Sequence, residues 1–290
     1  MRAAIFIPLL SALACANDAT DRARELYRKA DYTDAIAALK QDALKQGEPD
    51  AQTVELLGQC YYQSGDFKKA VDTLEKAVAL APSDSMIQDW LGRAWGERAE
   101  TSFPLAAPGH ARKAREAFEK AVRLDPANAV ALNDLFDYYI QAPGIMGGGI
   151  EKARELIPSL ARLDPVGGHL AQAKLDEEKK QFAAAETELR AAIRMAPDKA
   201  GPVLELAQFL SRRGRHDESD QAFQQAASVA PDSPRILFAR AESLVKSKRN
   251  VAEARDLLKQ YLAARGLTPD DPPRWEALRL MKKAAEGGAQ

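Results

Sequence analysis

The sequence predicts an all-α protein built from stacked helix–turn–helix repeats. Ala, Leu, Glu, Lys and Arg dominate the 290 residues, β-branched residues are sparse, and no alternating strand pattern is present. Apolar residues recur at helical spacing in paired segments that close at Pro82, Pro126, Pro165, Pro197 and Pro231. These prolines are 44, 39, 32 and 34 residues apart. One unit of about 34 residues therefore repeats along the chain.

Residues 51–84 carry the clearest copy of this unit. The small Gly58 is expected where the two helices approach closely, and the large Leu74 falls on the facing stripe of the second helix. Gly65 can take the left-handed conformation that ends the first helix, and Asp66 can cap the second. One such hairpin cannot bury its own apolar face, so it must stack on neighbouring hairpins.

The unit resembles the tetratricopeptide repeat (TPR). This resemblance implies a right-handed TPR superhelix, an α-solenoid of about seven repeats, and a protein-binding surface whose partner it does not name. The chain also resembles uncharacterised exported bacterial TPR proteins with a Pro-Gly-Ile-x-Gly-Gly-Gly loop, which implies no activity. The eight matching positions are Leu57, Gly58, Tyr61, Tyr62, Ala70, Leu74, Ala77 and Pro82.

Degraded copies of the unit fill residues 17–271, and the first of them ends at Gly47. The proline spacing gives the third and fourth repeats extra residues, which we expect to form turns at 101–109 and 142–149. Stacking would place these two loops on one edge, where their apolar side chains would share a partner-docking patch. The alternative is that each side chain covers its own helix end. The loop-edge residues are Phe103, Leu105, Ile145 and Met146.

Residues 1–16 are predicted to be an export signal rather than part of the fold. Arg2 gives a minimal positive start, and residues 3–14 form an apolar core that is too short to span a bilayer. Residues 12–15 also loosely resemble a lipobox, which would make Cys15 a lipidated N-terminus. Three alternatives stay open: a soluble periplasmic protein, a lipid-anchored envelope protein, and a cytosolic protein with an uncleaved apolar start.

Residues 272–290 are predicted to hold a capping helix and a frayed tail. A proline pair starts an amphipathic stretch whose apolar stripe holds Trp275, Leu278 and Met281. Such a helix would cover the exposed end of the last repeat.

Charge and motif content argue against catalysis, metal binding and nucleic-acid binding. The 41 basic and 42 acidic residues give a net charge of −1 and are interleaved along the chain. The three histidines lie in different repeats without ligand spacing. Residues 144–149 have the glycine spacing of a phosphate-binding loop, but Ile150 stands where lysine is required. We expect Cys60 to be a buried free thiol, and we predict no catalytic residue, metal or cofactor.

The resemblance implies that the first helices of the repeats line a concave groove. A lysine–asparagine clamp for a C-terminal carboxylate is not supported, because Thr20 and Arg24 occupy those positions. The remaining side chains form hydrogen bonds readily and include few aromatics, which suits an extended peptide or a partner helix; the alternative is a merely solvated face. The predicted groove residues are Arg24, Tyr27, Arg28, Glu55, Gln59, Tyr62, Gln63, Asp89, Arg93, Glu97, Asn133 and Asp137, followed by Gln141, His169, Gln172, Asp176, Lys179, Lys180, Gln208, Arg212, Arg235, Phe238, Glu242 and Lys246.

Three functional classes remain open at this stage. The first is a non-catalytic scaffold of the cell envelope that binds a peptide or protein. The second is a structural self-assembling protein, and the third is a regulatory subunit of an envelope enzyme. The expected partner is a protein or peptide rather than nucleic acid, with membrane contact only through a lipid anchor at Cys15.

Overall fold

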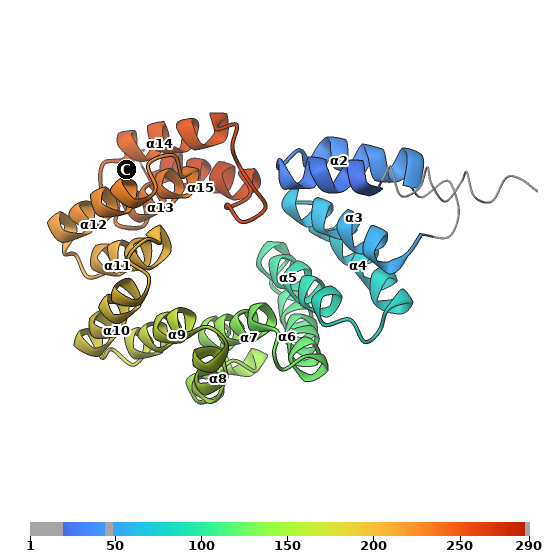
Figure 1. Cartoon of the computed structure of the whole chain (residues 1–290), viewed down its shortest axis with the longest axis horizontal. Coiled ribbons are helices and arrows are strands. Elements are labelled where there is room, and N and C mark those ends of the chain that lie inside the picture. The colour runs from blue at the N-terminus through green and yellow to red at the C-terminus, as the bar shows by residue number, and fades with distance from the viewer. Residues whose placement is uncertain (1–19, 44–48, 288–290) are drawn as a thin grey trace, which may run out of the picture. The chain divides into compact units, whose positions relative to one another are not determined.

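The computed structural model describes residues 20–43 and 49–287. Within these ranges every regular element is a helix, and the helices follow one another as antiparallel pairs (Figure 1). The predictions for the export signal with Cys15, for the repeat end at Gly47 and for the last three residues lie outside the described ranges.

Seven helix pairs and a final helix occupy the described residues, as the repeat count predicts. The first pair is formed by helical residues 20–28 and α2 (Tyr32–Ala38), which continues as a π-helical stretch, Leu39–Ala43. The next are α3 (Ala51–Gln63) with α4 (Phe67–Leu80), α5 (Ser85–Thr101) with α6 (Ala107–Leu124), α7 (Ala129–Gln141) with α8 (Ile150–Leu163), α9 (Pro165–Glu178) with α10 (Phe182–Met195), α11 (Ala200–Arg212) with α12 (His216–Val229), α13 (Pro234–Lys246) with α14 (Val251–Ala263), and finally α15 (Arg274–Gly287).

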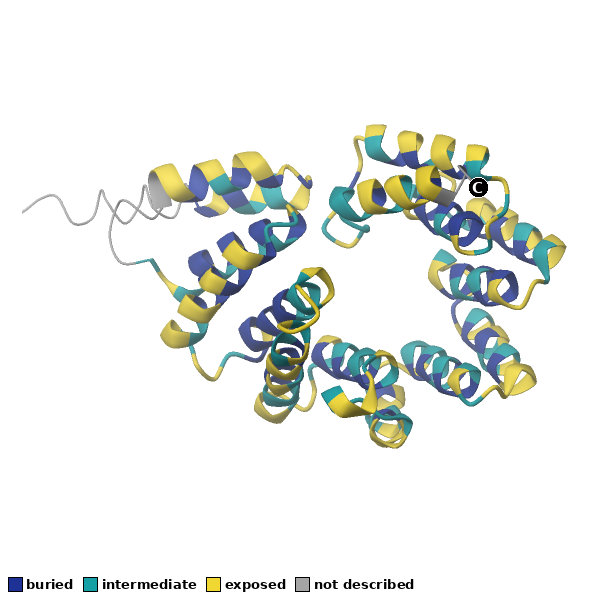
Figure 2. Ribbon diagram, turned by 180° about the vertical axis from the view of Figure 1, so that it is seen from behind, coloured by how far each residue is buried: buried dark blue, intermediate teal, exposed yellow. Residues whose placement is uncertain are grey.

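Contacts divide the chain into two compact units. Unit 1 comprises Met1–Ala117 and Leu267–Asp270, and unit 2 comprises Phe118–Gly266 and Asp271–Gln290. The division falls inside α6. In each unit the buried positions run along the facing sides of the helices, while exposed positions alternate with them on the outward sides (Figure 2).

The pair α3–α4 shows why the repeat sequence folds in this way. A Cβ atom built on Gly58 would lie 2.6 Å from Cγ of Leu74, so only glycine allows the two helices to approach this closely. Gly65 has a φ of 78° and ends α3 in the left-handed conformation. The side chain of Asp66 then caps α4 by accepting a hydrogen bond from the backbone N–H of Lys69 at 3.1 Å. The roles predicted for Gly58 in the helix contact and for Gly65 and Asp66 in the turn are therefore confirmed.

The same left-handed turn recurs in other repeats, although several of them lack glycine there. Gly214 has a φ of 73°, but Ala30, Lys180 and Lys248 reach 54°, 60° and 55° at the corresponding position. A side chain in this conformation costs about 1–2 kcal/mol, because its Cβ crowds the following carbonyl oxygen. The hairpin geometry is therefore imposed by helix packing even where the local sequence disfavours it.

The extra residues of the third repeat lengthen its helices more than its turn. The predicted loop 101–109 is too long: Thr101 ends α5, residues 107–109 form the first turn of α6, and only residues 102–106 connect the helices. Pro108 is tolerated in that first turn because the N–H groups there have no intrahelical acceptor. In the fourth repeat, by contrast, residues 142–149 do form the connection.

The final helix packs on the last pair, but through a different stripe from the predicted one. Ala277 and Ala284 are buried, and Leu280 packs against a cluster that contains Leu244. Leu278, which was expected on the buried stripe, is 55% exposed. The small alanines face the preceding helices because they allow a closer approach than the larger apolar side chains would.

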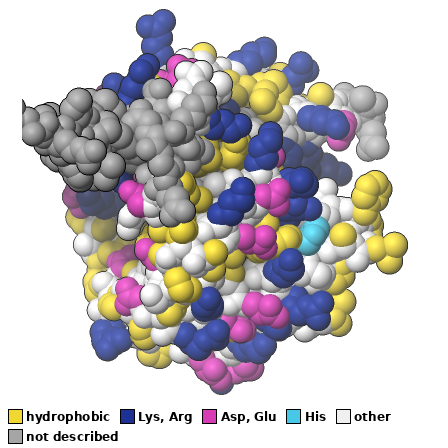
Figure 3. All heavy atoms as spheres, turned by 90° about the vertical axis from the view of Figure 1, so that its right-hand side faces the viewer, with side chains coloured by type: hydrophobic (Ala, Val, Ile, Leu, Met, Phe, Trp, Pro, Cys, Tyr) yellow, Lys and Arg dark blue, Asp and Glu magenta, His cyan; other side chains and the backbone are white. Residues whose placement is uncertain are grey.

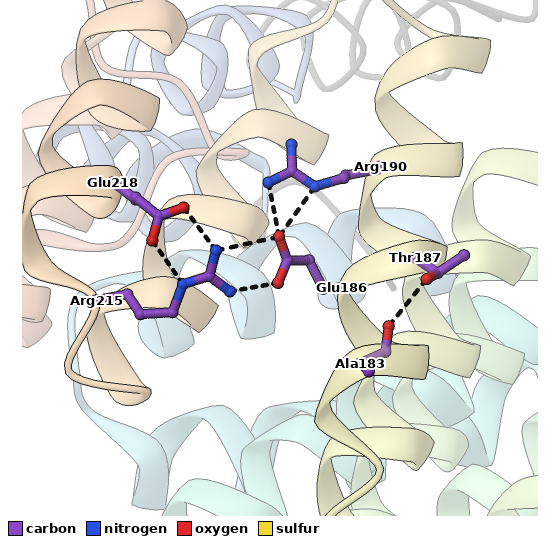
Figure 4. A network of polar contacts seen from close by, with 6 residues as sticks. All are labelled: Ala183, Glu186, Thr187, Arg190, Arg215 and Glu218. Carbon is purple, nitrogen blue, oxygen red and sulfur yellow. Dashed lines mark hydrogen bonds and ion pairs between the residues drawn. The ribbon is translucent and has the colours of Figure 1, made fainter.

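Ion pairs join neighbouring repeats on the second helices of unit 2. Arg215, just before α12, forms hydrogen-bonded ion pairs with Glu186 of α10 and with Glu218 of its own helix (Figure 4). Arg190 adds a 2.6 Å contact to the same Glu186 carboxylate. The two arginines hold the pKa of the Glu186 carboxyl below its usual range. This network links the start of α12 to α10.

Candidate functional site

In unit 1 the inward-facing side chains of α3 and α5 are tied to one another. Asp89 is fully buried and pairs with Arg93 at 3.0 Å, while the Arg93 guanidinium lies 4.6 Å from the centre of the Trp90 ring. The Tyr62 ring packs edge-on against Trp90 at 5.5 Å between ring centres. Gln63 is buried as well. Gln63 and Asp89 were predicted to face the groove, but both are buried, and Nε2 of Gln63 donates a hydrogen bond of 3.2 Å to the carbonyl oxygen of Pro269.

Glu55 and Gln59 remain at the surface of α3, one helical turn apart. Nε2 of Gln59 donates a hydrogen bond of 2.8 Å to Oε1 of Glu55. Partial burial, with the nearby negative charge of Asp84, raises the pKa of the Glu55 carboxyl to about 7, while the Gln59 hydrogen bond opposes this shift. Near neutral pH this carboxyl can therefore act as either a donor or an acceptor toward a ligand.

The predicted groove residues of the first helix carry ordinary local contacts. Arg24 pairs with Asp21 at 2.7 Å, and Arg28 pairs with Glu25 at 3.5 Å, both along the same exposed helix surface. Burial raises the pKa of the Tyr27 hydroxyl above its ordinary value. Glu97, on α5, is half-buried.

In unit 2 the first helices α7 and α9 are bridged by a charged pair. Asp137 of α7 accepts hydrogen bonds of 3.0 and 3.2 Å from the Lys174 ammonium of α9. Burial disfavours the charged ammonium, but Asp137 and Glu205 outweigh this and leave the Lys174 pKa raised. Asn133, one turn before Asp137, is half-buried.

Polar contacts continue across α9, α11 and α13. Arg212 of α11 donates two hydrogen bonds, of 2.9 and 2.8 Å, to the Glu177 carboxylate of α9. Gln208 of α11 donates one of 3.1 Å to Glu242 of α13, and the Lys246 ammonium reaches the same carboxylate at 2.7 Å. The inward side chains of unit 2 thus form a ladder of opposite charges rather than a field of one sign. The outer face of unit 1, which Figure 3 shows, also carries basic side chains interspersed with acidic and apolar ones.

His169 and Asp176 of α9 do not belong to this ladder. Nδ1 of His169 lies 2.5 Å from Oε2 of Glu188 on α10, so the ring faces the second helix of its own pair instead of the groove. Asp176 is buried and accepts a 2.8 Å hydrogen bond from Gln172. Both were predicted to face the groove and are corrected here for that reason.

Two pockets open on this inward surface of unit 2. The larger, of about 530 Å³, lies over the first turns of α9, α11 and α13 and is also lined by Pro272, just before α15, and by Glu276 of α15. The smaller, of about 280 Å³, lies over the last turns of α11 and α13. Gln208 and Glu242 line both pockets, so the two pockets are adjoining parts of one trough. The hydrogen bond between these two side chains lies where the pockets meet.

The loop of residues 142–149 is built by specific contacts. Gly147 takes a φ of 88°, and a Cβ on Gly148 would lie 1.8 Å from the carbonyl oxygen of Ala142. The Tyr138 hydroxyl donates to the Met146 carbonyl oxygen at 2.8 Å, and the Lys152 ammonium donates to that of Gly147 at 2.9 Å. The glycine run is thus required by the loop's own tight path, which gives it a structural reason unconnected with phosphate.

The apolar side chains of the two loops are unequally exposed. Phe103, Leu105 and Ile145 are 87%, 99% and 93% exposed, whereas Met146 is half-buried. The first two belong to unit 1 and the other two to unit 2. The first three therefore do not cover their own helix ends. The shared docking patch stays a prediction.

Comparisons with known proteins now bear on the repeats. Residues 20–85, 109–128 and 177–237 each match a family model described as tetratricopeptide repeat. The chain belongs to the tetratricopeptide repeat family.

Solved structures of other TPR proteins share the fold of this one. A TPR protein from Parabacteroides merdae ATCC 43184 superposes with a TM-score of 0.61 at 14% identity, covering 94% of this chain and 99% of that one. A thermophilic TPR protein of Thermus thermophilus gives a TM-score of 0.56 at 18% identity, covering 67% and 98%. At these identities the likeness concerns the fold alone.

One curated relative is similar in sequence. Cellulose synthase operon protein C of Xanthomonas axonopodis pv. citri (strain 306) is 28% identical in an alignment of 187 positions that covers 61% of this chain. The matched part spans 11% of that protein's length.

Several features of this TPR surface left no signal in the sequence. The wall that Pro272 and Glu276 add to the larger pocket depends on how the chain returns after α14. Glu205 was not among the predicted groove residues, although it lines that pocket between Leu204 and Gln208. Within the described ranges no helix is long and apolar enough to cross a membrane, and no three His, Cys, Asp or Glu side chains are grouped to hold a metal ion.

Proposed function

We propose that this TPR protein is a non-catalytic interaction scaffold that binds a peptide or partner protein through the inward surface of its first helices. TPR proteins are in general protein-interaction scaffolds, and one observation favours the inward surface here. The trough of unit 2 combines apolar lining with hydrogen-bonding side chains, which is how a cleft gains affinity from burial and specificity from polar groups. The loop edge with Phe103, Leu105, Ile145 and Met146 is the competing docking surface.

We further propose that the scaffold works in the cell envelope. The support is the signal-like composition of residues 1–16, with Cys15 as the lipidation candidate. A regulatory subunit of an envelope enzyme is a second candidate, favoured by the name of the relative, which is a cellulose synthase operon protein. The exposed Ile145 on its tightly built loop favours the third candidate, self-assembly.

Site-directed photo-crosslinking tests the docking surface in the cell. A photoreactive amino acid is placed in the full chain at Gln59 and Gln208 on the inward surface, at Leu105 and Ile145 on the loops, and at the exposed outward Gln224 as a control. We expect covalent adducts with a second protein at Gln59 or Gln208 and none at Gln224.

Each alternative has its own crosslinking pattern. Adducts confined to Leu105 or Ile145 would move docking to the loop edge. Adducts composed of two copies of this chain would favour self-assembly. If none of the positions gives an adduct, the scaffold function is wrong.

A further inference from the structure

The larger pocket of unit 2 has an apolar floor, and a side chain of α14 packs against the buried side of that floor. Leu170 of α9, Leu204 of α11 and Phe238 of α13 line it, one from each first helix. The Phe238 ring packs against Tyr261 of α14 at 5.4 Å between ring centres. The Tyr261 hydroxyl also donates a hydrogen bond to the carbonyl oxygen of Pro272, which forms the pocket wall. One buried tyrosine thus supports both floor and wall, so the pocket is preformed.

Charges are distributed unevenly along this pocket. Lys199 and Arg235 line its rim where α11 and α13 begin, and both are exposed. Glu205 and Glu242 lie one to two turns further along the same helices, and Glu276 is on the wall. The end of the pocket near the helix starts is therefore basic, and its middle is acidic.

Glu205 stands apart from the other carboxylates of the trough. Glu242 already accepts from Gln208 and pairs with Lys246, and Glu177 is held by Arg212. Among the described residues Glu205 makes neither a hydrogen bond nor an ion pair, although its negative charge contributes to the raised pKa values of both Lys174 and Arg212. It is thus half-buried in a pocket and available to a cation brought by a ligand.

We propose that this pocket is a specificity site for an extended polypeptide segment that presents an apolar side chain and a lysine or arginine side chain on the same face. The apolar side chain fills the floor of Leu170, Leu204 and Phe238, and the cation on the same face of the segment pairs with Glu205. This deepens the proposed scaffold function and rests on it. A volume of about 530 Å³ accommodates such a pair of side chains, since ligand pockets span about 300–1,000 Å³.

The chain offers a substitution that closes the pocket without disturbing the fold. Gly201 lines the pocket in the first turn of α11, and a Cβ added there meets no atom within 4 Å. Gly201→Trp therefore places a large ring in the pocket mouth. Gly109→Trp is the matched control, because Gly109 lies in the first turn of α6 with the same free space and lines none of these pockets.

The experiment uses the full chain and a display library of random dodecapeptides. We expect the selected peptides to share an apolar residue and a Lys or Arg at a spacing that places both side chains on one face of the extended segment. A synthetic copy of the best one, labelled for fluorescence anisotropy, should lose at least about ten-fold in affinity on Gly201→Trp and on Glu205→Lys, since each change removes one anchor. Gly109→Trp should stay within about two-fold.

Other outcomes overturn the proposal. Peptides that bind Gly201→Trp as tightly as the unaltered chain, a selected motif without a basic residue, or no selected motif would each refute the pocket's role. Self-association that Gly201→Trp abolishes would assign the pocket to a second copy of this chain. Partner adducts at Gln59 but never at Gln208 would leave the scaffold function standing while refuting this pocket.

Discussion

The close approach of α3 and α4 at Gly58 gives a quantitative test of the repeat geometry. Gly58→Ala adds one Cβ atom at 2.6 Å from Cγ and 2.8 Å from Cδ2 of Leu74. Leu74 is fully buried, so it cannot move into open space. Replacing glycine by alanine inside a helix stabilises it by about 1 kcal/mol, whereas overpacking a dense core costs about 1–3 kcal/mol. The net change should be a loss of up to about 2 kcal/mol in the free energy of unfolding.

A second glycine supplies the control for this change. Gly96 lies inside α5, and a Cβ there meets no atom within 4 Å, so Gly96→Ala should gain the helix-propensity term of about 1 kcal/mol undiminished. Leu74→Ala should cost about 2–5 kcal/mol because it empties a fully buried site. In that background Gly58→Ala should turn stabilising, since the clash is gone.

The assay is urea denaturation followed by far-ultraviolet circular dichroism. It compares the unaltered chain with Gly58→Ala, Gly96→Ala, Leu74→Ala and the double variant Gly58→Ala/Leu74→Ala. The reasoning requires Gly58→Ala and Gly96→Ala to have opposite signs. If Gly58→Ala stabilises the protein as much as Gly96→Ala does, the helices do not cross at Gly58 and the register of the repeat is wrong.

Three further predictions concern backbone strain and pH. Ala30→Gly should raise the free energy of unfolding by about 1 kcal/mol in the same denaturation assay, because Ala30 has a positive φ; a loss would contradict the left-handed turn. The folded-state pKa of Glu55 lies above its unfolded value of 4.5, so stability should fall as pH rises from about 4.5 to 7, and Glu55→Gln should flatten this slope in thermal melts; an unchanged slope would exclude the raised pKa. The pKa of Glu186 is lowered by Arg215 and Arg190, so its contribution should be present above pH 4.5 and lost in more acidic solution; Glu186→Gln melting curves that keep the full acid sensitivity would contradict this.

The sequence determines the helices and turns of this protein more completely than its surface. Gly58, Gly65 and Asp66 act through neighbours within one hairpin, and their roles could be predicted from local spacing. The position of Asp89 could not be predicted in this way, because the repeat register gives it an inward position although its side chain is fully buried. The prediction for Leu278 was wrong for a similar reason. The apolar stripe of the last helix was clear from the sequence, but the smaller Ala277 and Ala284 are the residues that are buried against the preceding helices.

The candidate site, too, could be predicted from the sequence only in part. Gln208, Arg212 and Glu242 were expected to face inward from the repeat register, and the structure joins them in one trough. That Arg212 is held by Glu177, and that Pro272 lines a pocket, depends on distances between segments remote in sequence. Sequence spacing alone carries no information about such distances.

The central claim is that partners dock on the inward surface, and crosslinking from one matched pair of glutamines tests it most directly. Gln208 lies in the trough on α11, and Gln224 is exposed on α12, the second helix of the same pair. The account predicts a covalent partner adduct from a photoreactive residue at 208 and none from one at 224. An adduct at 224 without one at 208 would contradict it.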